Sequence, residues 1–155
     1  MTEDIRKSVT VPLDSKAAFD LYFKRMADWW PLESHSMSAH DDKPARTVKV
    51  DLKVGGNITE LTHDDREEVW GTITALTSGR SLSYDWYVGR PREEATKVVI
   101  AFSDVPEGCR IDLTHTGFEV LGAEAQTMAK RYDTGWNMVL GQCFAQAARS
   151  LVPTV

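Results

Sequence analysis

The C-terminal run from about Ala123 to Ser150 constrains the fold of this chain more than any other stretch. Its apolar residues recur at helical spacing and project onto one side of a helical wheel: Ala125, Met128, Tyr132, Trp136, Val139, Leu140, Cys143 and Ala147. At 1.5 Å per residue, the predicted helix is roughly 40 Å long. Gly135 lies in its middle and is expected to permit close packing or to leave room beside Trp136. A helix with one apolar side must cover an apolar surface, which the rest of the chain has to supply.

The residues before this helix predict one strand, one or two short helices and about six consecutive strands. Ile5 to Val11 alternates as a strand, and a helix capped by Asp14 or Ser15 is expected to run to about Asp28, before Trp29-Trp30-Pro31. The later strands are predicted at residues 47–54, 57–62, 68–77, 82–88, 97–102 and 109–116. In the third of these, the facing direction is ambiguous because Trp70 and Ile73 have opposite parity; a bulge near Gly71 would reconcile them.

Connections of hairpin length between these strands favour an antiparallel meander. The sequence therefore predicts an α+β fold of two layers. A curved antiparallel sheet of about six or seven strands is expected to wrap around the long C-terminal helix.

Length, charge and cysteine content restrict the classes of protein to which this chain can belong. With 155 residues, it is predicted to form one domain over residues 1–155. The formal net charge is −5, so no electrostatic footprint for nucleic acid is present. No apolar run approaches a membrane span and the N-terminus has no apolar leader region, so neither membrane insertion nor secretion is expected. Cys109 and Cys143 lie far apart in the sequence, which favours reduced thiols in a cytoplasmic protein.

Several short segments, taken in order, resemble the Bet v 1-like or START-related (SRPBCC) superfamily. Within it, the chain is similar to the group homologous to the C-terminal domain of the heat-shock-protein-90 ATPase activator. The segments that carry the resemblance are Phe19 with Trp29-Trp30-Pro31, Gly55-Gly56, Trp70 to Ile73, Arg80 to Trp86, Leu113 to Phe118, and Gly135 to Leu140. The resemblance runs from roughly Ile5 to Leu151. It implies the helix-grip fold and a cavity between helix and sheet, where members of the superfamily bind lipids, steroids, hormones or polyketide intermediates.

Inward-facing aromatic residues are the main candidates for a binding site, because small-molecule sites combine apolar walls with a few polar tips. The candidate ligand-binding residues are Trp30, Trp70, Tyr84, Trp86, Phe102, His115, Met128, Tyr132, Trp136 and Leu140. The alternative is that these aromatic side chains fill a solid core. The Trp29-Trp30-Pro31 segment is open to three interpretations: a lid, a docking patch or a plug at the end of the core.

His115 continues the apolar face of the last strand, so it is expected to point inward near the long helix. There it either orients a ligand or transfers a proton, or it is a core histidine that is hydrogen-bonded to a neighbour.

His35, His40, Asp41 and Asp42 do not follow a recognised ligand spacing, so they predict a solvated loop and no metal site. No phosphate-binding, dinucleotide, serine-hydrolase or zincin motif is present, and no cofactor is expected. Cys109 and Cys143 are interpreted as inert buried thiols.

The leading functional prediction is a binding domain that holds a small hydrophobic or aromatic molecule between the helix and the sheet, as a monomer or homodimer. The alternative is a chaperone-activator-like module that binds another protein. The third hypothesis is an enzyme of the cyclase, aromatase or hydrolase kind, with His115 or Tyr132 as acid–base group. No residue is assigned a catalytic role.

Overall fold

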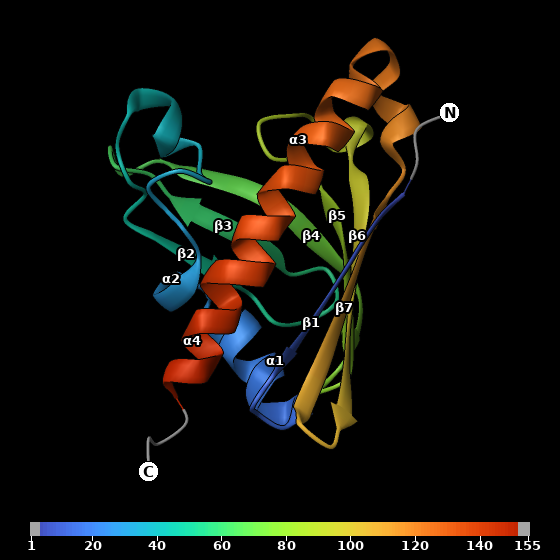
Figure 1. Cartoon of the computed structure of the whole chain (residues 1–155). Coiled ribbons are helices and arrows are strands. Elements are labelled where there is room, and N and C mark those ends of the chain that lie inside the picture. The colour runs from blue at the N-terminus through green and yellow to red at the C-terminus, as the bar shows by residue number, and fades with distance from the viewer. Residues whose placement is uncertain (1–3, 152–155) are drawn as a thin grey trace.

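A computed structural model describes residues 4–151 of the chain; residues 1–3 and 152–155, at the two ends of the predicted domain, lie outside the described residues. Seven strands form one antiparallel sheet in the order β1-β7-β6-β5-β4-β3-β2. The strands are β1 (Ile5–Val11), β2 (Thr47–Val50), β3 (Asn57–Leu61), β4 (Glu67–Thr77), β5 (Ser81–Trp86), β6 (Thr96–Val105) and β7 (Gly108–Thr116). The sheet curls around the long C-terminal helix (Figure 1), so the predicted helix-grip architecture is confirmed.

β2 is shorter than the alternation of apolar residues predicted. It ends at Val50, and Val54, which the pattern placed in the strand, is 62% exposed. The chain turns instead, because Lys53 N–H donates to the Asp51 carbonyl and Gly56 N–H donates to the Lys53 carbonyl. Only glycine fits at the end of this turn, since a Cβ on Gly56 would lie 2.0 Å from the Asp51 carbonyl oxygen.

A bulge in the strand that carries Trp70 resolves the ambiguity about which way its side chains face. Ile58 of β3 lies opposite Gly71 of β4 and Thr59 lies opposite Val69, so Trp70 is the extra residue. A bulge shifts the side-chain alternation by one position. As a result, Trp70 and Ile73 are both buried despite their opposite parity.

The N-terminal helical region consists of two helices where one was expected to reach Asp28. α1 (Ser15–Lys24) is capped by the Asp14 carboxylate, which accepts a hydrogen bond from Ala17 N–H at 2.8 Å. Arg25 leaves the helical conformation, with φ at −124°, and α2 (Met26–Trp29) follows. Three short 3₁₀ turns complete the connections: η1 (Ser38–Asp41), η2 (Arg92–Glu94) and η3 (Phe118–Glu124).

The C-terminal helix is continuous but changes its winding near its middle. α3 (Ala125–Met138) passes into a π-helical segment, η4 (Val139–Phe144), and then into α4 (Ala145–Ser150). A π turn contains more residues than an α turn, so the buried face moves along the sequence. Beyond Leu140 the fully buried residues are therefore Phe144, Ala145 and Ala148, whereas Cys143 and Ala147, predicted on the inner face, are only partly buried.

The space between helix and sheet holds one hydrophobic cluster, which has two parts that differ in composition. Where α1 packs on β6 and β7, Phe19, Tyr22 and Phe23 contact Phe102, and Tyr22 also contacts Phe144. The other part of the cluster consists mainly of tryptophans. Within residues 4–151, no helix is long and apolar enough to cross a membrane.

Candidate ligand pocket

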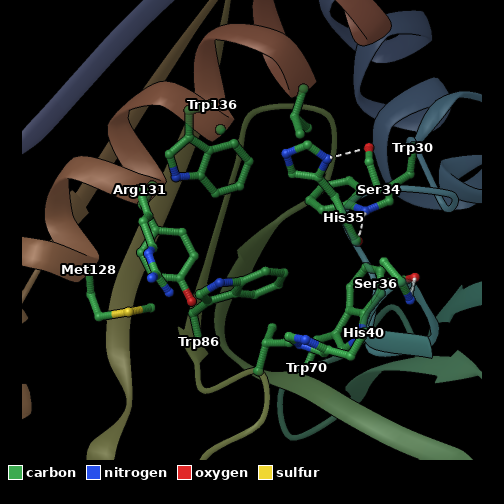
Figure 2. A pocket seen from close by; sticks show the side chains of 15 residues that line it. Trp30, Ser34, His35, Ser36, His40, Trp70, Trp86, Met128, Arg131 and Trp136 are labelled. Carbon is green, nitrogen blue, oxygen red and sulfur yellow. Dashed lines mark hydrogen bonds between the residues drawn. The ribbon is translucent and has the colours of Figure 1, made fainter. Parts of the chain in front are cut away.

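A pocket of about 400 Å³ lies between α3, the ends of β4 and β5, and the connection that follows α2. Cavities of this size hold small organic molecules. The lining residues are Trp30, Ser34, His35, Ser36, Ala39, His40, Trp70, Trp86, Val88, Met128, Arg131, Tyr132, Gly135, Trp136 and Val139. Figure 2 shows Met128, Arg131 and Trp136 on one side, the connection with His35 and His40 on the other, and Trp70 and Trp86 between them.

Four tryptophans from four different segments form the aromatic part of the pocket wall. The ring centroid of Trp30 lies 5.3 Å from that of Trp70, 6.2 Å from that of Trp86 and 6.1 Å from that of Trp136. Trp29, which does not line the pocket, is 5.7 Å from Trp30. All five tryptophans of the chain therefore belong to one contiguous cluster, in which tilted and edge-on contacts are favourable.

The His35 imidazole packs against α3 at Gly135, where the absence of a side chain leaves space. A Cβ built on Gly135 would lie 3.6 Å from His35 Nε2, so the room that the sequence predicted beside Trp136 is filled partly by the imidazole ring. His35 Nδ1 is 2.7 Å from Ser34 Oγ (Figure 2), and Trp30 Nε1–H donates to the His35 carbonyl at 2.7 Å. Burial lowers the pKa of His35 more than nearby Glu33 raises it, so the ring is neutral at pH 7.

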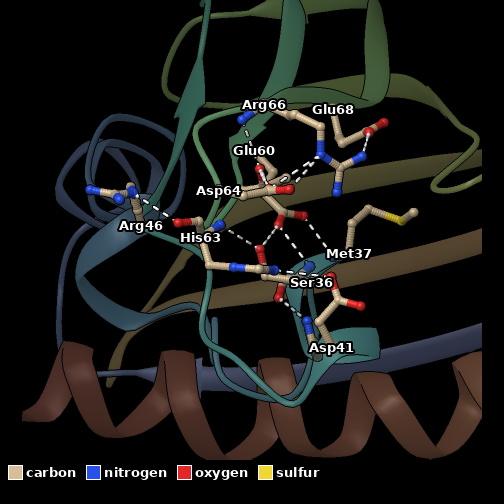
Figure 3. Close-up of polar contacts among 12 residues, drawn as sticks. Ser36, Met37, Asp41, Arg46, Glu60, His63, Asp64, Arg66 and Glu68 are labelled. Carbon is tan, nitrogen blue, oxygen red and sulfur yellow. Dashed lines mark hydrogen bonds and ion pairs between the residues drawn. The ribbon is translucent and has the colours of Figure 1, made fainter.

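A buried carboxylate fastens the connection to the sheet. Glu60 on β3 is fully buried, and Oε1 accepts from Met37 N–H at 2.6 Å and Trp70 Nε1–H at 2.9 Å. Oε2 accepts from the backbone N–H of Ser38 at 3.0 Å and from its hydroxyl at 2.9 Å. Figure 3 shows Met37 of the connection beside Glu60. Since four donors satisfy the carboxylate, it holds one pocket tryptophan and the pocket-lining connection in fixed positions.

His115 lies behind the pocket wall and links two of its tryptophans. Trp136 Nε1–H donates to His115 Nδ1 at 3.0 Å, which leaves the proton of the neutral ring on Nε2. His115 Nε2 is 2.6 Å from Thr96 Oγ1, and that hydroxyl donates to the Trp86 carbonyl at 3.3 Å. Burial lowers the pKa of His115 to about 3. Both ring nitrogens are engaged, so the arrangement matches the core-histidine interpretation.

The charge of the lining differs from that of the whole chain. The chain carries a formal net charge of −5, yet among the described residues no carboxylate lines the pocket and Arg131 is its charged residue. Burial raises the pKa of Tyr132, so its phenol is protonated at pH 7. The pocket therefore offers aromatic surface, hydroxyl and imidazole groups and one cation.

The structure brings together six of the residues predicted from sequence and separates four from them. Trp30, Trp70, Trp86, Met128, Tyr132 and Trp136 line the pocket. Tyr84, Phe102, His115 and Leu140 do not line it; all four are buried in the core. Tyr84 packs on the far side of the pocket wall, with its ring centroid 5.4 Å from that of Trp86.

The lining residues beyond Trp30 in the connection after α2 were not predicted from the sequence, and neither were Val88, Val139 and those between the apolar positions of α3. Arg131 and Gly135 lie three and seven residues after Met128, so helical spacing alone would have placed them beside it. Ser34, Ser36 and Ala39 have no periodic pattern that could have located them. Glu60 did carry a signal, because it alternates with Ile58 and Thr62, both buried, and a carboxylate on a buried face requires partners.

The residues considered for metal binding or thiol chemistry do not form a cluster. His63 Nε2 pairs with Asp41 at 2.9 Å, and His35 pairs with Ser34. Among residues 4–151, no group of three His, Cys, Asp or Glu side chains could hold a metal ion. Cys109 and Cys143 are free, and burial raises the pKa of Cys109 to about 11. That pKa makes Cys109 a poor nucleophile at pH 7.

A seven-stranded antiparallel sheet closed over a long C-terminal helix defines the helix-grip class of the Bet v 1-like superfamily. Residues 24–148 match the model of the family described as "Activator of Hsp90 ATPase homolog 1-like protein", and the chain belongs to this family. No curated protein matches the sequence.

Several solved structures share the fold. The Aha1 dimer from Colwellia psychrerythraea is 12% identical, with a TM-score of 0.69 over 95% of this chain and 96% of that one. An AHSA1-like protein from Aeromonas hydrophila is 19% identical, with a TM-score of 0.65 over 99% and 98% of the two chains. The anthrahydroquino-γ-pyrone synthase Txn09 is 27% identical, with a TM-score of 0.63 over 92% and 95%.

Proposed function

We propose that this protein binds a small aromatic or hydrophobic molecule in the pocket between α3 and the sheet. The observation that carries the proposal is a cavity of about 400 Å³ whose wall contains four of the five tryptophans and no carboxylate. Indole faces favour flat apolar ligands, and the few polar groups among them would set the orientation. The similarity to Txn09, a synthase whose named product is an anthrahydroquino-γ-pyrone, supports an aromatic ligand.

The test is to fill the pocket from the helix side. Gly135→Leu would place an isobutyl group at the lining, against His35, whereas Gly141→Leu would add the same group at an exposed position with no atom within 4 Å of its Cβ. With 9-fluorenone as the probe, the original chain should show saturable quenching of tryptophan emission and a rise in Tm. Gly135→Leu should weaken binding about tenfold or more, and Gly141→Leu should leave it unchanged.

The proposal fails if a panel of hydrophobic probes and lipid extracts gives neither saturable quenching nor a thermal shift. It also fails if both leucine variants bind 9-fluorenone as the original chain does, because the probe would then occupy another site.

The name of the family favours a second candidate, a module that binds another protein as a chaperone activator would. The large exposed hydrophobic residues within the described chain are Val54, Val120 and Leu151, which lie on three separate segments. Within the described chain, these three residues give a partner no contiguous patch of large hydrophobic side chains to contact. Stimulation of Hsp90 ATPase activity that survives Gly135→Leu and is lost on reversal of surface charge would favour this candidate over ligand binding.

A further inference from the structure

One tryptophan of the cluster differs from the other four in its hydrogen bonding. Trp29, Trp30, Trp70 and Trp136 each donate their indole N–H, to the Leu21 carbonyl, the His35 carbonyl, the Glu60 carboxylate and His115 respectively. Trp86 Nε1–H is buried and has no partner among the described residues. A buried donor without an acceptor costs free energy, so such a group in a pocket wall indicates a missing partner.

The polar atom beside this donor belongs to Tyr132. The Trp86 N–H lies close enough to the Tyr132 hydroxyl to oppose the rise that burial causes in its pKa, although the two do not meet in hydrogen-bond geometry. Tyr132 is half-buried and lines the pocket. Figure 2 shows the nitrogen-bearing edge of Trp86 turned toward the α3 side, where Met128 and Arg131 lie. A shift of either side chain that brings the phenol oxygen into line with the N–H would complete the missing hydrogen bond.

We propose that Tyr132 is the polar anchor of the pocket: its oxygen accepts from Trp86 Nε1–H while its hydroxyl proton is donated to an oxygen acceptor on an aromatic ligand. This inference rests on the proposed function and specifies the ligand chemistry. A phenol has one proton to donate and lone pairs to accept with. With the indole N–H bound to the oxygen, the hydroxyl proton is still free to be donated into the pocket. The ligand is therefore an aromatic molecule with a carbonyl or comparable oxygen, rather than a pure hydrocarbon.

Two probes of the same shape separate this oxygen from the aromatic rings. Fluorene and 9-fluorenone share a tricyclic skeleton, and only the ketone has an acceptor. Tyr132→Phe removes the hydroxyl and keeps the ring. The ratio of fluorene to fluorenone Kd should fall about three- to tenfold in Tyr132→Phe relative to the original chain. Tyr87→Phe is the matched control, because that hydroxyl bonds Thr72 Oγ1 at 2.7 Å outside the pocket, and it should leave the ratio unchanged.

A second measurement uses the unaltered protein and reports on Trp86 itself. Solvent exchange of the Trp86 indole proton, assigned by its loss in Trp86→Phe, should slow when fluorenone saturates the pocket and should not slow with fluorene. An equal Kd ratio in the original chain and Tyr132→Phe, with no selective slowing of exchange, would overturn the inference and leave the proposed function intact. If neither probe binds the original chain, the proposed function and the inference fail together.

Discussion

Within residues 4–151, the hydroxyl of Tyr22 has no hydrogen-bond partner, although its side chain is fully buried between Phe23, Trp29, Phe102 and Phe144. An unpaired buried hydroxyl costs about 1–3 kcal/mol. Tyr22→Phe should therefore leave the free energy of unfolding unchanged or raise it by about 1 kcal/mol, as measured by urea denaturation. Tyr87→Phe, which breaks a hydrogen bond to Thr72, should lower it by about 1 kcal/mol. A loss in Tyr22→Phe as large as in Tyr87→Phe would show that the Tyr22 hydroxyl is satisfied in solution.

His115 should make the protein less stable in mild acid. Its pKa is about 3 in the folded state and about 6.5 when unfolded, so the unfolded chain binds the proton more readily as the pH falls. The stability it supplies is present above pH 6.5 and is lost toward pH 3, with a loss of about 2 kcal/mol between pH 6.5 and 4.5. The lowered pKa of His35 adds to the same trend.

The measurement for this prediction is the free energy of unfolding across that pH range in the original chain, His115→Asn and His40→Gln. His115→Asn should flatten the pH dependence even if it lowers the stability at pH 7. His40→Gln changes an exposed residue and should keep the slope. An unchanged slope in His115→Asn would assign the acid sensitivity to other groups.

The elements of the fold differ in how far the sequence predicted them. Alternation located six of the seven strands closely, and apolar spacing located the C-terminal helix, because both patterns follow from burying one face of a regular element. The π-helical segment Val139–Phe144 was not predicted, since its residues suit an α-helix and the change of winding arises from docking on the sheet. The break at Arg25 was also not predicted, because the helical spacing of apolar residues continues across it. Like the π-helical segment, it depends on tertiary packing.

Two glycines of the C-terminal helix should respond alike to alanine and differently to larger residues. A Cβ on Gly135 meets only His35, at ordinary contact distance, and a Cβ on Gly141 meets nothing within 4 Å. Each change to alanine should raise the free energy of unfolding by about 0.5–1 kcal/mol, because alanine favours helix. Thermal denaturation of both variants checks this, and a loss of stability in Gly135→Ala alone would show that the glycine is required for packing.

The connection after α2 should detach from the sheet when Glu60 is altered. Glu60→Gln replaces one acceptor oxygen with an amide nitrogen that faces two donors, so the variant should lose about 2–4 kcal/mol of unfolding free energy. The control is Glu68→Gln, whose half-exposed carboxylate pairs with Arg66 at 3.2 Å and should cost less than about 1 kcal/mol. Faster hydrogen exchange at Met37 and Ser38 in Glu60→Gln would locate the change, and equal losses in the two variants would contradict it.

At the scale of the whole molecule, the acidic chain surrounds a pocket without carboxylates, and this distribution favours anionic over cationic ligands. 9-Fluorenone-2-carboxylate should bind about two- to fivefold more weakly to Arg131→Gln. Lys130→Gln removes a neighbouring charge that does not line the pocket and should have little effect. Titrations at low and high salt check this, since the effect of Arg131 should shrink as salt increases. If Arg131→Gln and Lys130→Gln weaken binding of the carboxylate equally, the loss reflects the change in net charge and not a contact with Arg131.

Apart from Trp30, the residues of the candidate site that could be predicted lie on regular elements. Inward positions of β4, β5 and α3 made Trp70, Trp86 and Trp136 candidates, and all three line the cavity. Phe102 shares this inward orientation yet meets α1 instead of the cavity. The difference depends on which part of the sheet α1 covers, and that is a property of tertiary packing which no local pattern records.

The contiguity of the tryptophans has an optical consequence. Indoles with centroids about 5–6 Å apart exchange excitation energy, so light absorbed by Trp29, outside the cavity, can migrate through Trp30 to Trp86 or Trp136. A bound molecule that quenches one tryptophan would then also reduce the fluorescence of its neighbours. The protein therefore contains its own reporter of occupancy, and a screen of candidate ligands needs no added dye.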